Sequence, residues 1–135
     1  MPPLISIITI NLNNAGGLER TIKSVASQSF RNYSYVVVDG NSKDHSKNVI
    51  IKNESSIDRW ISEADSGIYD AMNKGAALAD GEYLLYLNSG DLLIHRHVLK
   101  RVSKFLVDST DIVYGDLIVQ NQGGRLQRIN YPPVL

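Results

Sequence analysis

The chain has 135 residues with 14 basic and 14 acidic side chains, so its formal net charge is zero. A hydrophobic content of 43% and a charged content of 21% are those of an ordinary globular domain and argue against a disordered or fibrous chain. The zero net charge gives no support for a nucleic-acid-binding protein, and the absence of cysteine excludes disulfides, thiolate metal sites and a cysteine nucleophile.

The first predicted element is a β-branched, nearly all-apolar run at residues 4–10, typical of a strand buried on both faces. It is far shorter than the roughly 20 residues that span a bilayer. It also lacks the basic n-region and small-residue cleavage site of a signal peptide. We therefore expect no transmembrane segment in this chain and a cytoplasmic location.

A polar, glycine-containing loop at residues 11–17 leads into a helix, because Leu18, Ile22, Val25 and Ala26 recur at helical spacing. A second buried strand is predicted at 33–39 and is closed by turn-forming residues at 40–42. The elements predicted after it are a polar helix at 44–53, a short strand at 58–62, a helix at 67–79 and a strongly apolar strand at 82–87.

The last predicted elements are a helix at 95–107, a strand at 111–120, a turn at 121–124 and a returning strand at 125–131, after which residues 131–135 add no closing helix. Strands and helices alternate at least three times, which calls for parallel strands joined by right-handed crossovers. The predicted fold class is therefore α/β, with a mostly parallel sheet and helices on both of its faces.

Polar residues follow the predicted strands at their carboxyl ends, at 11–14, 39–42, 63–65 and 88–91. Ligands of open α/β sheets bind at this edge, so we expect these groups to share a pocket. Asp39 is either a turn residue that bonds its own backbone or a carboxylate for a nucleobase or ribose. Asp91 is either a capping residue or a ligand of Mg²⁺ or Mn²⁺, which prefer oxygen ligands and bridge to phosphates.

The loop at 11–17 matches neither the dinucleotide-binding fingerprint nor the P-loop, which weakens the dehydrogenase and NTPase interpretations. His95 and His97 are two residues apart and cannot share a helical face, so we interpret them as surface residues. The sequence contains no visible nucleophile elbow and no Ser-His-Asp order.

Two longer motifs, SEADSGIYDAMNKG at 62–75 and ADGEYLLYLNSGD at 79–91, closely resemble the core of family 2 glycosyltransferases. Within that family, the sequence is most similar to the branch that acts in bacterial capsule and exopolysaccharide assembly, of the colanic-acid type. The segments IITINLN at 7–13, SVASQ at 24–28 and VVVDGNS at 36–42 are similar to the same family. The resemblance spans about residues 4–120.

The resemblance implies a GT-A fold in which a nucleotide-diphosphate sugar lies along the strand carboxyl ends. It places Thr9, Ile10, Asn11, Asn13 and Asp39 at the base and ribose, Asp65, Asn73 and Lys74 beside the nucleotide and sugar, and Asn88 and Asp91 at the diphosphate, with Asp91 as ligand of Mg²⁺ or Mn²⁺. This sequence departs from the commonest form of the metal motif, because Asn88 and Gly90 stand where carboxylates are usual.

The implied function is that of an inverting glycosyltransferase, which moves a sugar from a nucleotide-diphosphate sugar to a saccharide or lipid-linked saccharide acceptor in polysaccharide biosynthesis. Nucleic acid is not an expected partner, and peripheral association with the inner face of the membrane is compatible with such an acceptor. Members use a carboxylate base beyond the metal motif, where this sequence has Asp108, Asp111 and Asp116, none of which can be assigned as the base.

We therefore expect residues 1–135 to be the nucleotide-sugar-binding domain, with the acceptor-side region missing. Two alternatives stay open. The first is a non-catalytic module that binds a nucleotide sugar. The second is a nucleotidyltransferase, which needs a glycine-rich first loop with arginine or lysine that residues 11–17 do not supply.

Overall fold

The computed structural model describes residues 1–132. The chain divides into two compact units, Met1–Ser103 and Lys104–Leu135. The predicted absence of a closing helix at 131–135 falls mostly outside the described residues.

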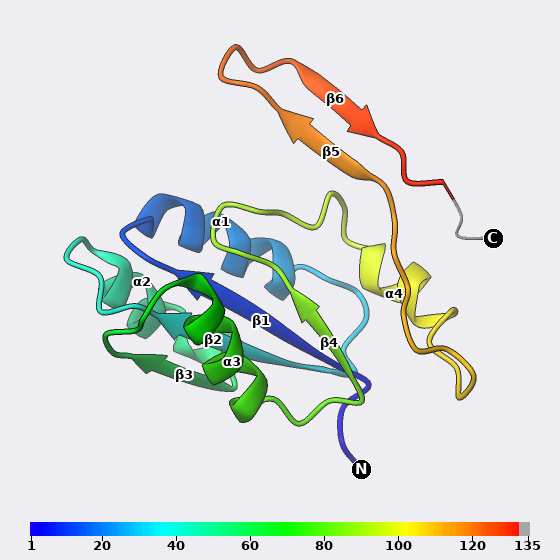
Figure 1. Cartoon of the computed structure of the whole chain (residues 1–135), viewed down its shortest axis with the longest axis horizontal. Coiled ribbons are helices and arrows are strands. Elements are labelled where there is room, and N and C mark those ends of the chain that lie inside the picture. Colours follow the sequence, from blue (N-terminus) through cyan, green and yellow to red (C-terminus); the bar gives the residue numbers. More distant parts are fainter. Residues whose placement is uncertain (133–135) are drawn as a thin grey trace. The chain divides into compact units, whose positions relative to one another are not determined.

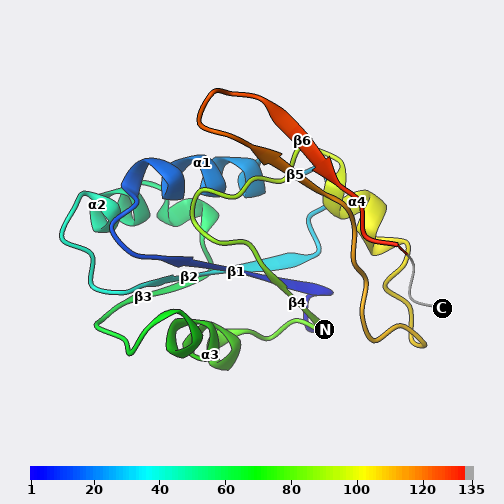
Figure 2. The same cartoon turned by 45° about the horizontal axis from the view of Figure 1, so that its top comes forward.

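Within Met1–Ser103, four parallel strands form one sheet in the order β3-β2-β1-β4. Their bounds are β1 Ile5–Asn11, β2 Tyr33–Asp39, β3 Arg59–Ser62 and β4 Tyr83–Tyr86. The helices α1 (Ala15–Ala26) and α2 (Ser46–Lys52) cover one face of the sheet, and α3 (Ile68–Leu78) covers the other (Figure 2). A 3-10 turn, η1, occupies Glu54–Ser56, and α4 occupies Val98–Ser103. The prediction of a parallel α/β sheet covered on both faces is confirmed.

The two central strands form the core, as their apolar composition predicts. All seven residues of β1 are buried, and their side chains alternate between the two faces. On one face, Ile8, Ile10, Val36 and Val38 pack with Ala71 of α3. The other face is covered by the apolar side of α1, on which Leu18, Ile22 and Val25 are at most 1% exposed.

Gly75 permits the close approach of α3 to the sheet. A Cβ atom at this position would lie 2.4 Å from the Cγ2 atom of Ile8, which is far inside van der Waals contact. A larger residue here would push α3 away from β1 and open the core between them.

The second unit contains an antiparallel hairpin of β5 (Leu117–Gln120) and β6 (Leu126–Ile129), visible in orange and red in Figure 1. The turn at residues 121–124 is closed by a hydrogen bond from the Gly124 N–H to the Asn121 carbonyl at 2.9 Å. The hairpin predicted from the sequence is therefore confirmed.

Most predicted elements exceed the observed ones by a few residues at most, and two are much longer. The strand expected to begin at residue 111 begins at Leu117, after the strand-breaking Gly115. The helix expected at 95–107 covers only Val98–Ser103. Its first residues form a turn instead, because the residues that follow α1 bond to their backbone groups. Gln28 donates to the His95 carbonyl at 2.9 Å, and the Ser29 N–H donates to the Arg96 carbonyl at 2.8 Å.

Candidate functional site

The carboxyl ends of the strands meet at one edge of the sheet, as the sequence predicts. The pairing places Asn11 of β1 opposite Asp39 of β2, and Asp39 opposite Ser62 of β3. On the far side of β1, the N–H of Ser89 donates to the Ile10 carbonyl at 3.1 Å, which carries the turn after β4 to the same edge.

Asp39 is the centre of a hydrogen-bond network at this edge and has no exposed surface. Its Oδ1 accepts from Asn11 Nδ2 at 2.8 Å and from Ser42 Oγ at 2.6 Å. Its Oδ2 accepts from the Ser42 N–H at 3.0 Å and from Ser62 Oγ at 2.8 Å. A carboxylate has about four acceptor positions, so the protein itself satisfies this one fully.

These bonds keep the Asp39 carboxylate ionised. Burial alone would raise its pKa, but the hydrogen bonds from Ser42, Asn11 and Ser62 outweigh burial and hold the pKa below its usual value. Asp39 therefore acts first as a turn-forming carboxylate, one of the two interpretations that the sequence allows. Its predicted contact with a base or ribose stays a prediction.

Two buried side-chain oxygens at this edge have no hydrogen-bond partner among the described residues: Oδ1 of Asn11 and Oδ1 of Asn88. The orientation of the Asn11 amide is determined by Asp39, because a carboxylate only accepts and the Nδ2 group must face it. The Oδ1 atom of Asn11 is therefore fixed as an acceptor. An unsatisfied buried acceptor costs roughly 1–3 kcal/mol, which a ligand that donates a hydrogen bond would offset.

The loops after β1 and β2 are joined by side chain–backbone bonds. The N–H of Asn13, a residue with a φ of 50°, donates to Ser42 Oγ at 2.8 Å. In return, Asn13 Oδ1 accepts from the Lys43 N–H at 2.7 Å. The Asp44 carboxylate accepts from the N–H of Ala15 at 2.9 Å. The exposed Asn13 thus lies at the rim of the edge and shapes both loops.

Asp65 and Lys74 organise the loop between β3 and α3. Asp65 Oδ1 accepts from the Gly67 N–H at 3.0 Å, and its Oδ2 would lie 2.8 Å from a Cβ atom at Gly40. The absence of a side chain at Gly40 therefore lets the Asp65 carboxylate reach the end of β2. Asp65 is thus at the predicted edge, and it is half-buried there.

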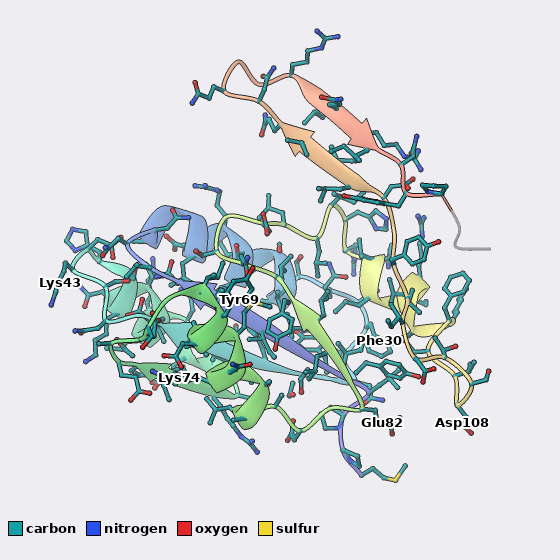
Figure 3. The ribbon with its side chains drawn as sticks, viewed as in Figure 1. Phe30, Lys43, Tyr69, Lys74, Glu82 and Asp108 are labelled. Atoms are coloured by element: carbon teal, nitrogen blue, oxygen red, sulfur yellow. The ribbon has the colours of Figure 1, made fainter. Side chains whose placement is uncertain are left out.

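Lys74 lies on α3 (Figure 3) and donates to the Ala64 carbonyl at 3.0 Å. Its Nζ is 3.2 Å from Glu63 Oε1 and 3.5 Å from Asp70 Oδ2. Desolvation alone would lower the pKa of Lys74, but these two carboxylates outweigh it and hold the pKa above its usual value. Lys74 is therefore a cation that holds the loop in place, while its neighbour Asn73 is exposed. Their predicted contact with nucleotide or sugar stays a prediction.

Thr9 and Ile10 lie in the interior of the sheet, 0% and 6% exposed. Thr9 Oγ1 is 2.9 Å from the hydroxyl of Tyr35, under the helices α1 and α2, and Ile10 packs in the core against α3. Both side chains thus belong to the core, and their predicted contact with the base and ribose stays a prediction.

Asp91 closes the turn after β4 and is exposed, and its N–H donates to the Asn88 carbonyl at 2.9 Å. Among residues 1–132, no cluster of three or more histidine, aspartate or glutamate side chains could hold a metal ion. Mg²⁺ and Mn²⁺ often bind one or two carboxylates and complete their shell with phosphate oxygens and water. The residues present therefore fit a cation shared between Asp91 and a diphosphate, not a cage made by protein alone.

The candidate bases of the second unit differ in their surroundings. Asp116 is held by the Arg128 guanidinium, and its Oδ1 accepts from the Tyr131 N–H at 3.3 Å. These bonds hold the pKa of Asp116 below its usual value, which makes it a weak proton acceptor. Asp108 and Asp111 are exposed. No base is assigned.

The sequence interpretation included Ser42 in the polar segment 39–42 but singled out neither Ser62 nor Thr21, whose hydroxyl groups complete the edge. Ser42 and Ser62 are bonded to Asp39, and Thr21 of α1 bonds to the turn that carries Asp91. Ser62 could have been found, because it ends a predicted strand directly before the polar segment 63–65. Thr21 gives no such signal, since its position fits one more residue of an amphipathic helix.

Comparison with known proteins gives the family context of this geometry. The profile of the family described as "Glycosyl transferase family 2" matches residues 6–133. A PGL/p-HBAD biosynthesis glycosyltransferase of Mycobacterium tuberculosis is 36% identical over 128 residues, which are 91% of this chain and 50% of that protein. The Escherichia coli UDP-Glc:alpha-D-GlcNAc-diphosphoundecaprenol beta-1,3-glucosyltransferase WfgD is 25% identical and covers 98% of this chain and 55% of its own length.

The chain thus spans about half the length of these curated relatives. Among solved structures, the mannosyltransferase PcManGT from Pyrobaculum calidifontis, in complex with GDP-Man and Mn²⁺, superposes with a TM-score of 0.73 at 22% identity. The match covers 82% of this chain and 34% of that one. It confirms the predicted GT-A fold. Within residues 1–132, no helix has the length and apolar character needed to cross a membrane.

Proposed function

The chain belongs to glycosyl transferase family 2, and on this premise we propose that the carboxyl edge of its sheet binds the nucleoside diphosphate of a sugar nucleotide. The observation that carries the proposal is the pair of buried, unpartnered oxygens Asn11 Oδ1 and Asn88 Oδ1. Asn11 is the last residue of β1 and Asn88 comes shortly after β4, and these two strands are neighbours in the sheet. The two acceptors thus belong to adjacent strand ends of one edge.

Asn11 Oδ1 suits a hydrogen-bond donor of the base or ribose. The ring N–H of uracil, thymine or guanine and the ribose hydroxyls are all donors, so the acceptor alone does not choose among them. Because the oxygen is shielded from solvent, a ligand must displace the atoms that cover it. Asp39 supports this contact indirectly by fixing the orientation of the Asn11 amide.

Asn88 and Asp91 suit the diphosphate end of the ligand. A divalent cation bound there would neutralise the charge that develops on the leaving diphosphate. The exposed Asp91 carboxylate would hold this cation, and the Asn88 amide oxygen is a further oxygen ligand of the type that Mg²⁺ and Mn²⁺ accept. PcManGT is complexed with GDP-Man and Mn²⁺, which supports the choice of a divalent cation.

For the whole enzyme we propose an inverting transfer to a saccharide or lipid-linked acceptor in polysaccharide assembly. The name of WfgD, which includes a diphosphoundecaprenol acceptor, supports this class of acceptor. We further propose that residues 1–135 are the donor-binding portion, because the chain spans about half of its relatives. The colanic-acid-type branch and a place at the inner membrane face stay predictions.

The test is calorimetry with UDP, GDP and dTDP, each with Mn²⁺, Mg²⁺ or EDTA, and with the matching nucleosides. We expect at least one diphosphate to bind more tightly with the cation than with EDTA. Asn11→Ala should weaken nucleoside and diphosphate alike, whereas Asn88→Ala should weaken only the cation-dependent binding. The control is Asn48→Ala, which removes an exposed amide on α2. Absence of binding by every nucleotide at millimolar concentration would refute the proposal.

A further inference from the structure

One face of α1 is polar although much of it is buried. The N-cap Asn14 and the residues Thr21 and Ser24 follow one another at intervals of seven and three, which places them on the same side of the helix, and Gln28 lies two residues beyond the end of α1 at Ala26. Thr21 and Gln28 have no exposed surface. Burial of such groups is costly unless each finds a hydrogen-bond partner.

All four side chains also bond to backbone groups of one segment, residues 89–99. This segment runs from the turn after β4 to the start of α4 and has no regular structure before Val98. The bonded pairs are Asn14 Nδ2 to Ser89 O at 3.3 Å, Gly90 N to Thr21 Oγ1 at 2.9 Å, Leu93 N to Ser24 Oγ at 3.3 Å, Gln28 Nε2 to His95 O at 2.9 Å and Leu99 N to Gln28 Oε1 at 3.1 Å. Helix α1 and Gln28, which follows it, thus supply the hydrogen-bond partners that a strand or helix would otherwise give to this segment.

Thr21 bonds to both residues at the tip of the turn. Its Oγ1 accepts from the Gly90 N–H and lies 2.8 Å from the Asp91 carbonyl, to which it donates in competition with the Gly17 carbonyl at 3.0 Å. Gly90 has a φ of 99°, a left-handed conformation that a glycine adopts readily. An external restraint is needed to hold so permissive a residue in one conformation.

We propose that Thr21 is a positioning residue for Asp91, and that through it α1 determines where the Asp91 carboxylate meets a cation and diphosphate. This inference rests on the proposed function of the edge as a nucleoside diphosphate site. Thr21 itself is buried, and its hydrogen bonds to the turn are both made with backbone groups. Its contribution is to hold the turn in its bound shape before the ligand arrives, so that binding does not have to order it.

The test compares Thr21→Val, which keeps the shape but removes the hydroxyl, with Thr21→Ser, which keeps the hydroxyl. Titrations use UDP and GDP with Mn²⁺ or EDTA, and uridine and guanosine. In Thr21→Val we expect the Mn²⁺-dependent affinity for the diphosphate to fall roughly 10–100-fold, the range for residues that orient metal ligands. Nucleoside affinity should stay within about twofold, and Thr21→Ser should restore the diphosphate affinity.

Amide hydrogen exchange gives an independent readout. The Gly90 N–H should exchange faster in Thr21→Val than in the wild type, because its acceptor is gone. The control is Ser27→Ala, which removes an exposed hydroxyl of the α1 C-cap that bonds to Ser24 O and not to residues 89–99. It should change neither the exchange at Gly90 nor the diphosphate affinity.

A wild type that binds no diphosphate with Mn²⁺ overturns both this inference and the proposed function. A wild type that binds, with a Thr21→Val variant that retains its Mn²⁺-dependent affinity, overturns only the positioning role. An equal weakening of nucleoside and diphosphate in Thr21→Val also overturns the positioning role, since general loss of structure would produce that result.

Discussion

Replacement of the Asp39 carboxylate by an amide, in Asp39→Asn, tests whether this buried charge organises the strand ends. The carboxylate accepts four hydrogen bonds, from Asn11, Ser62 and twice from Ser42. An asparagine can keep all four contacts only if its Nδ2 replaces Oδ1, the Ser42 hydroxyl rotates to accept, and the Asn11 amide flips. Neutral bonds are weaker than charge-assisted ones by about 1 kcal/mol each, and relief of charge burial offsets part of the loss.

The expected net loss is about 1–3 kcal/mol of unfolding free energy at neutral pH. The loss should depend on pH with a defined sign. The pKa of Asp39 is lower in the folded protein than in the unfolded chain, so its stabilisation is present above the unfolded pKa of roughly 3.9 and disappears as the pH falls through the folded pKa. The difference between wild type and Asp39→Asn should therefore shrink below about pH 4.

Urea denaturation followed by circular dichroism between pH 3 and 7 measures this difference. Asp108→Asn is the control, because it removes an exposed carboxylate of the second unit and the same unit of charge. A difference between wild type and Asp39→Asn that stays constant across the pH range would refute the role given to the ionised carboxylate. The flip of the Asn11 amide would also present an N–H donor to a ligand where the wild type presents an oxygen acceptor. Asp39→Asn should therefore lower the affinity for the nucleoside that the wild type prefers.

Three further predictions concern the core, the diphosphate and the reaction. Gly75→Ala should cost about 1–3 kcal/mol of unfolding free energy, because its Cβ would lie 2.4 Å from Ile8 Cγ2; an unchanged denaturation midpoint would contradict this. Asp91→Ala should abolish the cation-dependent part of UDP or GDP binding in calorimetry and leave uridine and guanosine unaffected; if cation dependence persists, Asp91 is only a turn residue. In an assay of nucleoside diphosphate release from sugar nucleotides, the 135-residue chain should show slow hydrolysis that acceptor glycans do not accelerate. The reason is that no carboxylate among residues 1–132 is assigned as the base, and a positioned base contributes roughly 10²–10⁴-fold by general-base catalysis; robust acceptor-dependent release would return Asp108 and Asp111 to consideration.

The positions of the strands along the chain are predictable from local sequence, because a strand that is buried on both faces consists almost entirely of apolar residues. The runs at 4–10 and 33–39 differ by at most one residue at each end from β1 and β2. The convergence of polar strand ends is equally predictable, since it follows from parallel pairing alone. The motifs at 62–75 and 79–91 additionally indicate the family, which the spacing of apolar residues alone does not reveal.

The hydrogen-bond network around Asp39 could not be predicted from local sequence, because two of its partners, Asn11 and Ser62, lie 28 and 23 residues away along the chain. The same holds for Thr9, whose place in the core depends on a hydroxyl partner 26 residues away. The predicted helix at 95–107 was too long for a related reason. Its first residues carry a helical pattern, but Gln28 and Ser29 of a distant segment compete for their backbone groups.

The cross-linking of the loops after β1 and β2 by hydrogen bonds has a consequence for re-engineering the edge. Asn13 is hydrogen-bonded to Ser42 and Lys43, and Ala15 is hydrogen-bonded to Asp44, so each bond joins one position of the first loop to one position of the second. An insertion of one residue in either loop would shift every later partner out of register and leave the opposite loop with unmatched donors and acceptors. Grafting only one of the two loops from a relative should therefore disable the chimera, whereas exchanging both as one cassette keeps each donor opposite its acceptor.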